Sequence, residues 1–277
     1  MRAVGTGVSG AGSASAVARW AVLAYGLAAY AMFLGVITYA MGFVSNVAVP
    51  RSIDAGGRSA SLLEAILVNA GLLAVFAIQH TIMARPWFKH RLARIMPSAA
   101  ERSTFVITAS AALALLMWQW RPVALDLWRI ESAAGQAAML AVCALGFGIV
   151  LYSSFLIDHF ELFGLRQAWS YFRGRAHTPR GFAERSLYKH VRHPLMLGFL
   201  IAFWATPHMT VGHLFFAVLI SGYVVMGIWF EERDLSANLG RAYEQYRRRT
   251  PMLIPRIRAA GRNGAARNAT MGASEPA

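Results

Sequence analysis

The sequence predicts an all-α fold, a polytopic membrane helical bundle of five to six membrane segments that ends in a helical hairpin. Hydrophobic residues make up 57% of the 277 positions and charged residues only 14%, whereas soluble domains carry about 25% charged residues. Several apolar runs approach the ~20 residues with which a helix crosses a bilayer. The net charge of +14 comes from basic residues in the loops and the tail, which indicates membrane orientation and no nucleic-acid partner.

The apolar runs are 17–43, 62–83, 104–120, 137–160, 195–206 and 210–230. The first run is longer than the 7–15 apolar residues of a signal sequence, so we expect a retained span. The last two runs form a predicted hairpin, because Pro207 between them cannot continue helical hydrogen bonding. The run 195–206 is short, and a five-span or re-entrant arrangement is an alternative to six spans.

The chain divides into one domain and two tails. We expect residues 1–16 and 259–277 to be disordered, because they are rich in small and polar residues. Residues 17–258 form one integral membrane domain, in which the hairpin 195–230 leads into a cytoplasmic region, 231–258. Lys and Arg gather in 84–103, 161–194 and after 230, while 44–61 and 121–136 hold two each. The positive-inside rule then places both termini and the basic loops in the cytoplasm, for which a bacterial inner membrane is the expected location. The sequence makes no prediction of the oligomeric state.

Ionisable residues at membrane depth are candidates for function, and here they gather at the predicted cytoplasmic ends of four segments. They are His80 in the second segment, Asp158 and His159 in the fourth, Arg192 and His193 at the start of the hairpin, and Glu231 and Glu232 at its end. Three further basic residues are expected to bind lipid phosphates: Arg85, Lys89 and Arg102.

A hairpin brings its two ends together, so Arg192 and His193 should lie beside Glu231 and Glu232. One interpretation is an ion pair that closes the hairpin. The other is a site for a small zwitterion, since Arg binds a carboxylate through two hydrogen bonds while Glu accepts from ammonium or hydroxyl groups. Pro194 suits the first position of a helix and disfavours helical geometry at His193, which turns this side chain towards the site.

The segment "LYKHVRHPLMLG", followed by "EERDL", resembles the integral membrane methyltransferases related to isoprenylcysteine carboxyl methyltransferase. That family often has Tyr soon after the proline, where this chain has Leu195 and Met196, a departure that argues against a prenylcysteine substrate. The resemblance implies that the hairpin forms a site for S-adenosyl-L-methionine. The residues assigned to it are Tyr188, Arg192, His193, Pro194, Leu197, Glu231 and Glu232.

Five blocks in order resemble the methanethiol S-methyltransferases, which make dimethyl sulfide, and the NnrU-like family shares parts of the pattern. They cover roughly residues 60–255 and read "QHTIMARPWFK", "ERSTFV", "LIDHFELFGLRQ", "YKHVRHPLMLGFLIAFWATPHMTVGHL" and "GRAYEQYRRRTPMLIP". The resemblance implies methylation of a small thiol, methanethiol, by an enzyme embedded in the lipid bilayer.

A thiolate is the nucleophile in such a reaction, and a cysteine-like thiol titrates at about 8.5. A positioned general base typically contributes ~10²–10⁴-fold, and His80 and His159 are the candidate bases. Asp158 is adjacent to His159, although neighbouring helical residues point about 100° apart.

A last candidate group lies beyond the hairpin. Tyr243, Tyr246 and Arg247 are spaced to share one helical face, which either closes the cofactor pocket or lies on anionic lipid.

Two other readings compete with thiol methylation. A related methyltransferase acts on an isoprenoid or a phospholipid, which requires a more open cleft. A haem or redox protein of the NnrU type uses His80 and His159 as axial ligands, but this gives Arg192 and the two glutamates no role. A permease or scaffold is disfavoured, because no pair of broken helices interrupts the apolar runs.

Overall fold

The computed structural model describes residues 15–178 and 184–255. Of the two tails that we expect to be disordered, residues 1–14 and 259–277 lie outside the described residues, whereas Ser15 and Ala16 lie within them. Ser15 is the N-cap of the first helix and Ala16 is its first residue, so these two residues belong to the first helix and not to a disordered tail.

Among the described residues, five helices are long and apolar enough to cross a membrane: α1 (Ala16–Ser45), α2 (Leu62–Ala84), α4 (Ser98–Gln119), α5 (Ala133–Ile157) and α9 (Val211–Leu239). The other elements are α3 (Pro86–Leu92), α6 (His159–Leu162), α7 (Leu165–Phe172), a 3-10 helix η1 (Ser186–Lys189), α8 (Pro194–Trp204) and α10 (Arg241–Arg249), with two short strands, β1 (Asp126–Arg129) and β2 (His208–Thr210). This arrangement confirms the predicted all-α membrane bundle.

Side-chain caps fix where the apolar helices begin. The hydroxyl groups of Ser15, Ser61, Ser132 and Thr210 accept hydrogen bonds from the first turns of α1, α2, α5 and α9. Such caps satisfy backbone N–H groups that have no partner within the helix.

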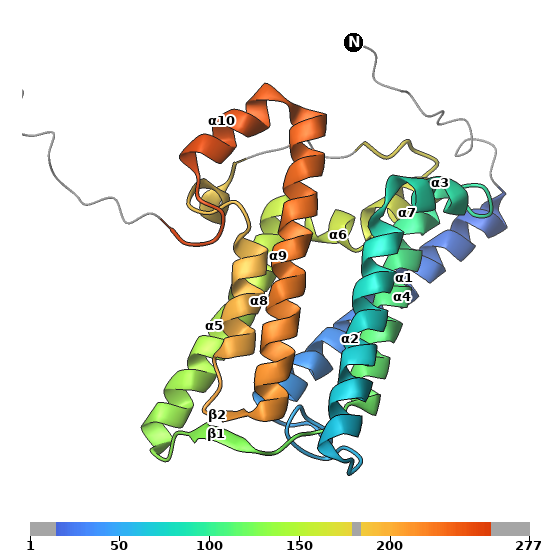
Figure 1. Cartoon of the computed structure of the whole chain (residues 1–277). Coiled ribbons are helices and arrows are strands. Elements are labelled where there is room, and N and C mark those ends of the chain that lie inside the picture. The colour runs from blue at the N-terminus through green and yellow to red at the C-terminus, as the bar shows by residue number, and fades with distance from the viewer. Residues whose placement is uncertain (1–14, 179–183, 256–277) are drawn as a thin grey trace, which may run out of the picture.

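The strands lie at one end of the bundle, whereas α3, α6, α7 and α10 lie at the other (Figure 1). The antiparallel pairing of β1 with β2 joins segments that are distant in the sequence, with Trp128 opposite Met209. This small sheet was not predicted. At the same end, Trp120 packs against Phe43 and Phe216 and its indole N–H donates to the carbonyl of Ile53 at 3.0 Å, which fixes the loops around the sheet.

The short helix α8 packs closely against α5. A Cβ atom added at Gly146 would lie 2.7 Å from the carbonyl oxygen of Gly198, and one added at Gly198 would lie 2.6 Å from the oxygen of Gly146. Only glycine permits this approach. With 11 residues, α8 is shorter than a full span, and residues 205–207 carry the chain on to β2. The predicted hairpin is therefore one short helix and one long helix.

Helix α9 continues to Leu239, beyond the predicted end of the hairpin at residue 230. Glu231 and Glu232 therefore lie inside a helix and not in a loop after it. At Gly240, whose φ of +55° favours glycine, the chain turns into α10, which lies across the end of the bundle (Figure 1).

Candidate functional site

Glu232 is the centre of an ion-paired network at the open end of the α8–α9 hairpin. Its Oε1 atom lies 2.7 Å from Nε and Nη2 of Arg192 and 3.0 Å from Nε2 of His193. Its Oε2 atom lies 3.4 Å from Nε of Arg247. We call these four residues the neck cluster. The prediction that the two ends of the hairpin meet is confirmed.

Arg192 has protein partners for all three guanidinium nitrogens. Its Nη1 donates to the carbonyl groups of Arg247, at 3.1 Å, and Thr250. The backbone N–H groups of Arg192 and His193 donate to the carbonyl groups of Pro251 and Met252, at 2.9 and 3.2 Å. Arg192 thus ties the segment after α10 to the start of α8. A direct role in binding a ligand carboxylate stays a prediction, and it requires that some of these bonds be exchanged.

Pro194 is the first residue of α8, the position predicted for it. His193 has φ −125° and ψ 61°, outside the helical region, and its side chain is 5% exposed. Its Nδ1 atom lies 3.6 Å from Oε2 of Glu231. Leu197 lies one turn further along, with its N–H bonded to the carbonyl of His193 at 3.0 Å. His193 therefore faces the two glutamates.

Three tyrosines pack beside the neck cluster. Tyr243 and Tyr246 of α10 are each 1% exposed, and the hydroxyl of Tyr246 donates to the carbonyl of Tyr188 at 2.6 Å. Burial raises the pKa of all three phenols, that of Tyr243 to about 12, because a phenolate is costly away from water. The tyrosines are neutral packing groups at pH 7, and α10 covers the neck cluster.

Two charged side chains of this region stay open to solvent. Glu231 is 50% and Arg247 51% exposed. An exposed carboxylate and an exposed guanidinium at the neck match the ammonium and carboxylate of a zwitterion, so the chemistry of these groups fits an amino-acid-like ligand.

The predicted base His159 is held by two hydrogen bonds. Its Nδ1 lies 2.8 Å from the hydroxyl of Ser154, which itself donates to the carbonyl of Leu151 at 2.6 Å. Nδ1 therefore carries the proton, and Nε2 accepts from the hydroxyl of Tyr30 at 2.9 Å. Burial lowers the pKa of His159, so the ring is neutral at pH 7. As a base, His159 would have to exchange the Tyr30 bond.

Asp158 has a different task from its neighbour. With φ +116° it ends α5, and its side chain accepts from the N–H of Glu161 and pairs with Arg166. The structure does not bring Asp158 to His159 as an orienting partner.

The other predicted base, His80, lies on α2 among the rings of Phe76, Phe105 and Tyr223, with centroids at 5.4, 4.8 and 6.4 Å. Tyr223 and Glu232 are nine residues apart on α9, about 180° around the helix. His80 and the neck cluster thus lie on opposite faces of α9, and the structure does not join all the predicted site residues into one cluster.

Sequence reasoning missed Arg102. It was expected to bind lipid phosphate, but its Nε donates to the carbonyl of Leu162 at 2.6 Å, inside the bundle. The other two expected anchors are paired with carboxylates, Arg85 with Asp234 and Lys89 with Glu101, each at 3.7 Å. The only signal in the sequence was that Arg102 stands directly before an apolar run. This position predicts how deep the residue lies in the membrane, but not which way its side chain points. Nothing in the sequence indicated that Tyr30 and Ser154 would form hydrogen bonds with His159.

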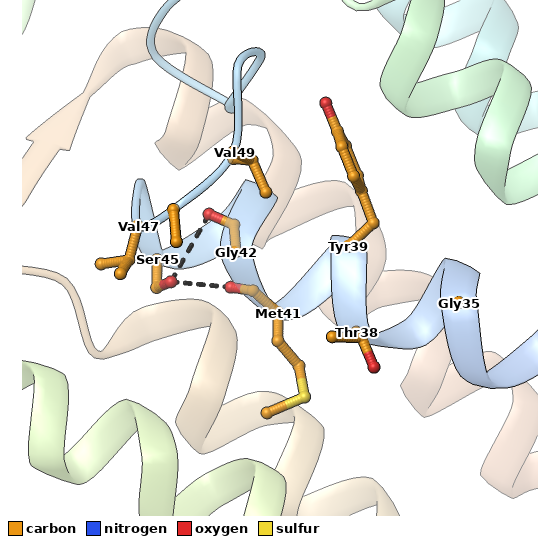
Figure 2. A pocket seen from close by; sticks show the side chains of 9 residues that line it. Gly35, Thr38, Tyr39, Met41, Gly42, Ser45, Val47 and Val49 are labelled. Carbon is orange, nitrogen blue, oxygen red and sulfur yellow. Dashed lines mark hydrogen bonds between the residues drawn. The ribbon is translucent and has the colours of Figure 1, made fainter.

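Two of the open hollows on the described part of the bundle differ in their relation to the site. One, of about 480 Å³, lies between the end of α1 and residues 47–49, where the hydroxyl of Ser45 donates to the carbonyl of Met41 (Figure 2). It is at the strand end, away from the neck cluster, and no charged side chain lines it. The other, of about 320 Å³, lies between α2 and α9 and is lined by small residues such as Ala74, Ala77 and Gly222, together with Tyr223. The second hollow therefore adjoins the surroundings of His80.

The fold and this site define an integral membrane protein with a charged, tyrosine-lined site at one end of its helices. The family model described as NnrU protein matches residues 68–264. The chain is 49% identical to the methanethiol S-methyltransferase of Mycobacterium tuberculosis, over 86% of this chain and 97% of that protein. It is 51% identical to methanethiol S-methyltransferase 2 of Bradyrhizobium diazoefficiens, over 87% of this chain and 92% of that protein. It is 46% identical to the methanethiol S-methyltransferase of Crocosphaera subtropica, over 88% of this chain and 96% of that protein.

The chain belongs to the NnrU family and, within it, to the family of the methanethiol S-methyltransferases. No solved structure matches it significantly.

Proposed function

We propose that this protein transfers a methyl group from S-adenosyl-L-methionine to methanethiol and so produces dimethyl sulfide. The observation that carries the proposal is the identity of about half the residues, over nearly the whole length, to relatives named for this reaction. The charged site at the end of a bundle of five apolar helices is consistent with a polar donor that arrives from water and a small acceptor that dissolves in lipid.

The neck supplies the groups for the donor. When bound, S-adenosyl-L-methionine supplies a methyl group on a positively charged sulfur. Arg247 would bind its carboxylate, and Glu231 would accept from its ammonium group or ribose hydroxyls. Glu232 and Arg192 hold α8, α9 and α10 together, so they position these contacts. The neutral tyrosines on and next to α10 exclude water.

The orientation of the bundle is part of the proposal. The basic segments 84–103, 161–178 and 184–194 lie at the same end as the neck cluster (Figure 1), which favours a cytoplasmic location for it. The donor would then reach the site from the cytoplasm.

A headspace assay tests the proposal. Purified protein in detergent is incubated with methyl-labelled S-adenosyl-L-methionine and methanethiol, and labelled dimethyl sulfide is measured by gas chromatography. We expect product well above the protein-free background. A folded, monodisperse preparation with only background product would overturn the proposal. Label recovered in extracted phospholipid or isoprenoid instead would keep the methyltransferase class and reject methanethiol as the substrate.

A further inference from the structure

Arg102 is a partly buried cation in the bundle interior. Its Nε bonds to the carbonyl of Leu162, at the end of α6, and its guanidinium carbon lies 4.8 Å from the centroid of the Phe105 ring. Within the described residues, no carboxylate lies within ion-pair distance of Arg102. Taking a cation out of water without a counter-ion costs free energy, so this arrangement favours an anion beside the guanidinium.

The carboxylates on the surrounding elements are already paired with other cations. The pairs are Glu101 with Lys89 of α3, Arg85 after α2 with Asp234 of α9, and Asp158 and Glu161 around α6 with Arg166 of α7; Glu161 also lies 3.4 Å from His177. Glu101 is the nearest carboxylate in sequence and acts on Arg102 at a distance. The titratable groups that face His80 are Tyr223, whose ring it contacts, and Arg102, which acts on it electrostatically.

His80 shares the ring of Phe105 with Arg102, at 4.8 Å between ring centroids. Its Nδ1 atom is buried and has no hydrogen-bond partner in the described part of the chain. Native structures keep few buried polar atoms without a partner, because each costs roughly 1–3 kcal/mol. Arg102 disfavours a positive charge on His80 while the guanidinium has no counter-ion. An acid that becomes an anion next to Arg102 removes this repulsion, so the imidazole nitrogen can then take the proton.

An open apolar hollow between α2 and α9 adjoins the surroundings of His80. Tyr223 contacts His80 and also lines this hollow, whose other lining residues are apolar and include Ala74, Ala77 and Gly222. A small neutral thiol fits such a hollow, whereas a charged donor does not.

We propose that Arg102 and His80 form the methyl-acceptor site, in which Arg102 binds the sulfur of the thiolate and His80 takes the thiol proton. This inference rests on the proposed function and names the residues that act on its acceptor.

The step balances as follows. The S–H bond of the thiol breaks, and its proton moves to His80 while the electron pair stays on sulfur beside Arg102. The thiolate sulfur forms a bond to the methyl carbon of the sulfonium donor. Because His80 and the neck cluster lie on opposite faces of α9, this step requires the donor to extend from its contacts at the neck around α9 to the thiolate. The bond from that carbon to the donor sulfur breaks and leaves its electron pair there, so two neutral thioethers and one imidazolium result. His80 then releases its proton to water.

The test compares Arg102→Met, Arg102→Lys and His80→Asn with wild type, and with Arg94→Met as the matched control at an exposed arginine. We measure kcat/KM for methanethiol from pH 6 to 9.5, and we measure the Kd of labelled S-adenosyl-L-methionine by equilibrium dialysis. We expect Arg102→Met and His80→Asn to lower kcat/KM at pH 7 by about a hundredfold. The loss should shrink at pH 9, where more thiolate forms without help, while the donor Kd changes less than threefold.

Arg102→Lys keeps the positive charge, so its kcat/KM should be at least tenfold higher than that of Arg102→Met and its pH profile should match wild type. If Arg102→Met fails to fold, Arg102→Lys and His80→Asn still test the inference. A donor Kd that weakens as much as kcat/KM, with an unchanged pH profile, would assign Arg102 to the carboxylate of the donor and overturn the inference. Variants as active as Arg94→Met would overturn it as well. If wild type itself methylates no thiol, the proposed function fails, which is a separate result.

Discussion

Two arginine–histidine pairs in this molecule have opposite surroundings. In the neck cluster, Arg192 and His193 share the carboxylate of Glu232. In the interior, Arg102 and His80 share only an aromatic ring, and the described residues offer them no carboxylate. The same residue types are neutralised in one region and left without a counter-ion in the other. The neck is suited to hold elements together, and the interior is suited to bind an anion.

The largest expected effect is on the stability of the neck. Glu232→Gln leaves Arg192, whose side chain is 9% exposed, without its counter-ion. Removing one partner of a buried ion pair typically costs about 3–5 kcal/mol. Thermal unfolding in detergent should show a large decrease in the melting temperature. An unchanged melting temperature would mean that the neck cluster is not structural.

The neighbouring carboxylate gives the matched contrast. Glu231 is half exposed, so Glu231→Gln should change stability by less than about 1 kcal/mol. If it contacts the donor as proposed, the Kd for S-adenosyl-L-methionine should rise about tenfold, which corresponds to ~1.4 kcal/mol. Equilibrium dialysis of both variants separates binding from folding. Equal donor affinity in Glu231→Gln and wild type would remove Glu231 from the site.

The smallest expected effect is a pH dependence of stability from His159. Its pKa is lowered in the folded protein by burial, so the unfolded chain binds its proton more readily. His159 therefore lowers the stability as the pH falls from about 7 through its ordinary value near 6.5 towards the lowered folded value. In unfolding curves at several pH values, His159→Gln should lose less stability than wild type over this window. A larger loss in the variant would give the pKa shift the opposite sign.

The apolar runs were sufficient to predict the spans, because hydropathy reports the cost of placing each residue in lipid. The meeting of Arg192 with Glu232 was also predictable, since a hairpin joins its ends. The pairing of β1 with β2 was not, because strands of four and three residues, separated in the sequence by α5, α6, α7, η1 and α8, carry little local signal. The direction in which the Arg102 side chain points was missed for a related reason. Hydropathy predicts how deep a residue lies in the membrane, whereas the direction of its side chain depends on neighbours that are distant in the sequence.

The sequence also could not predict that every guanidinium nitrogen of Arg192 has a partner within the protein. Its bonds to the carbonyl groups of Arg247 and Thr250 depend on α10 folding back over the neck. The spacing of Tyr243 and Tyr246 predicted their common face on α10 but not which bundle surface would bury them.

The most direct measurement compares two matched variants, Arg192→Met and Arg102→Met, by melting temperature and by kcat/KM for methanethiol. We expect Arg192→Met to lose most of its stability, because Glu232 keeps only His193 and the half-exposed Arg247. Arg102→Met should keep a melting temperature near that of wild type and lose about a hundredfold in kcat/KM. If both variants lose stability equally, or if Arg102→Met keeps wild-type activity, the division between a structural neck and a reactive interior is wrong.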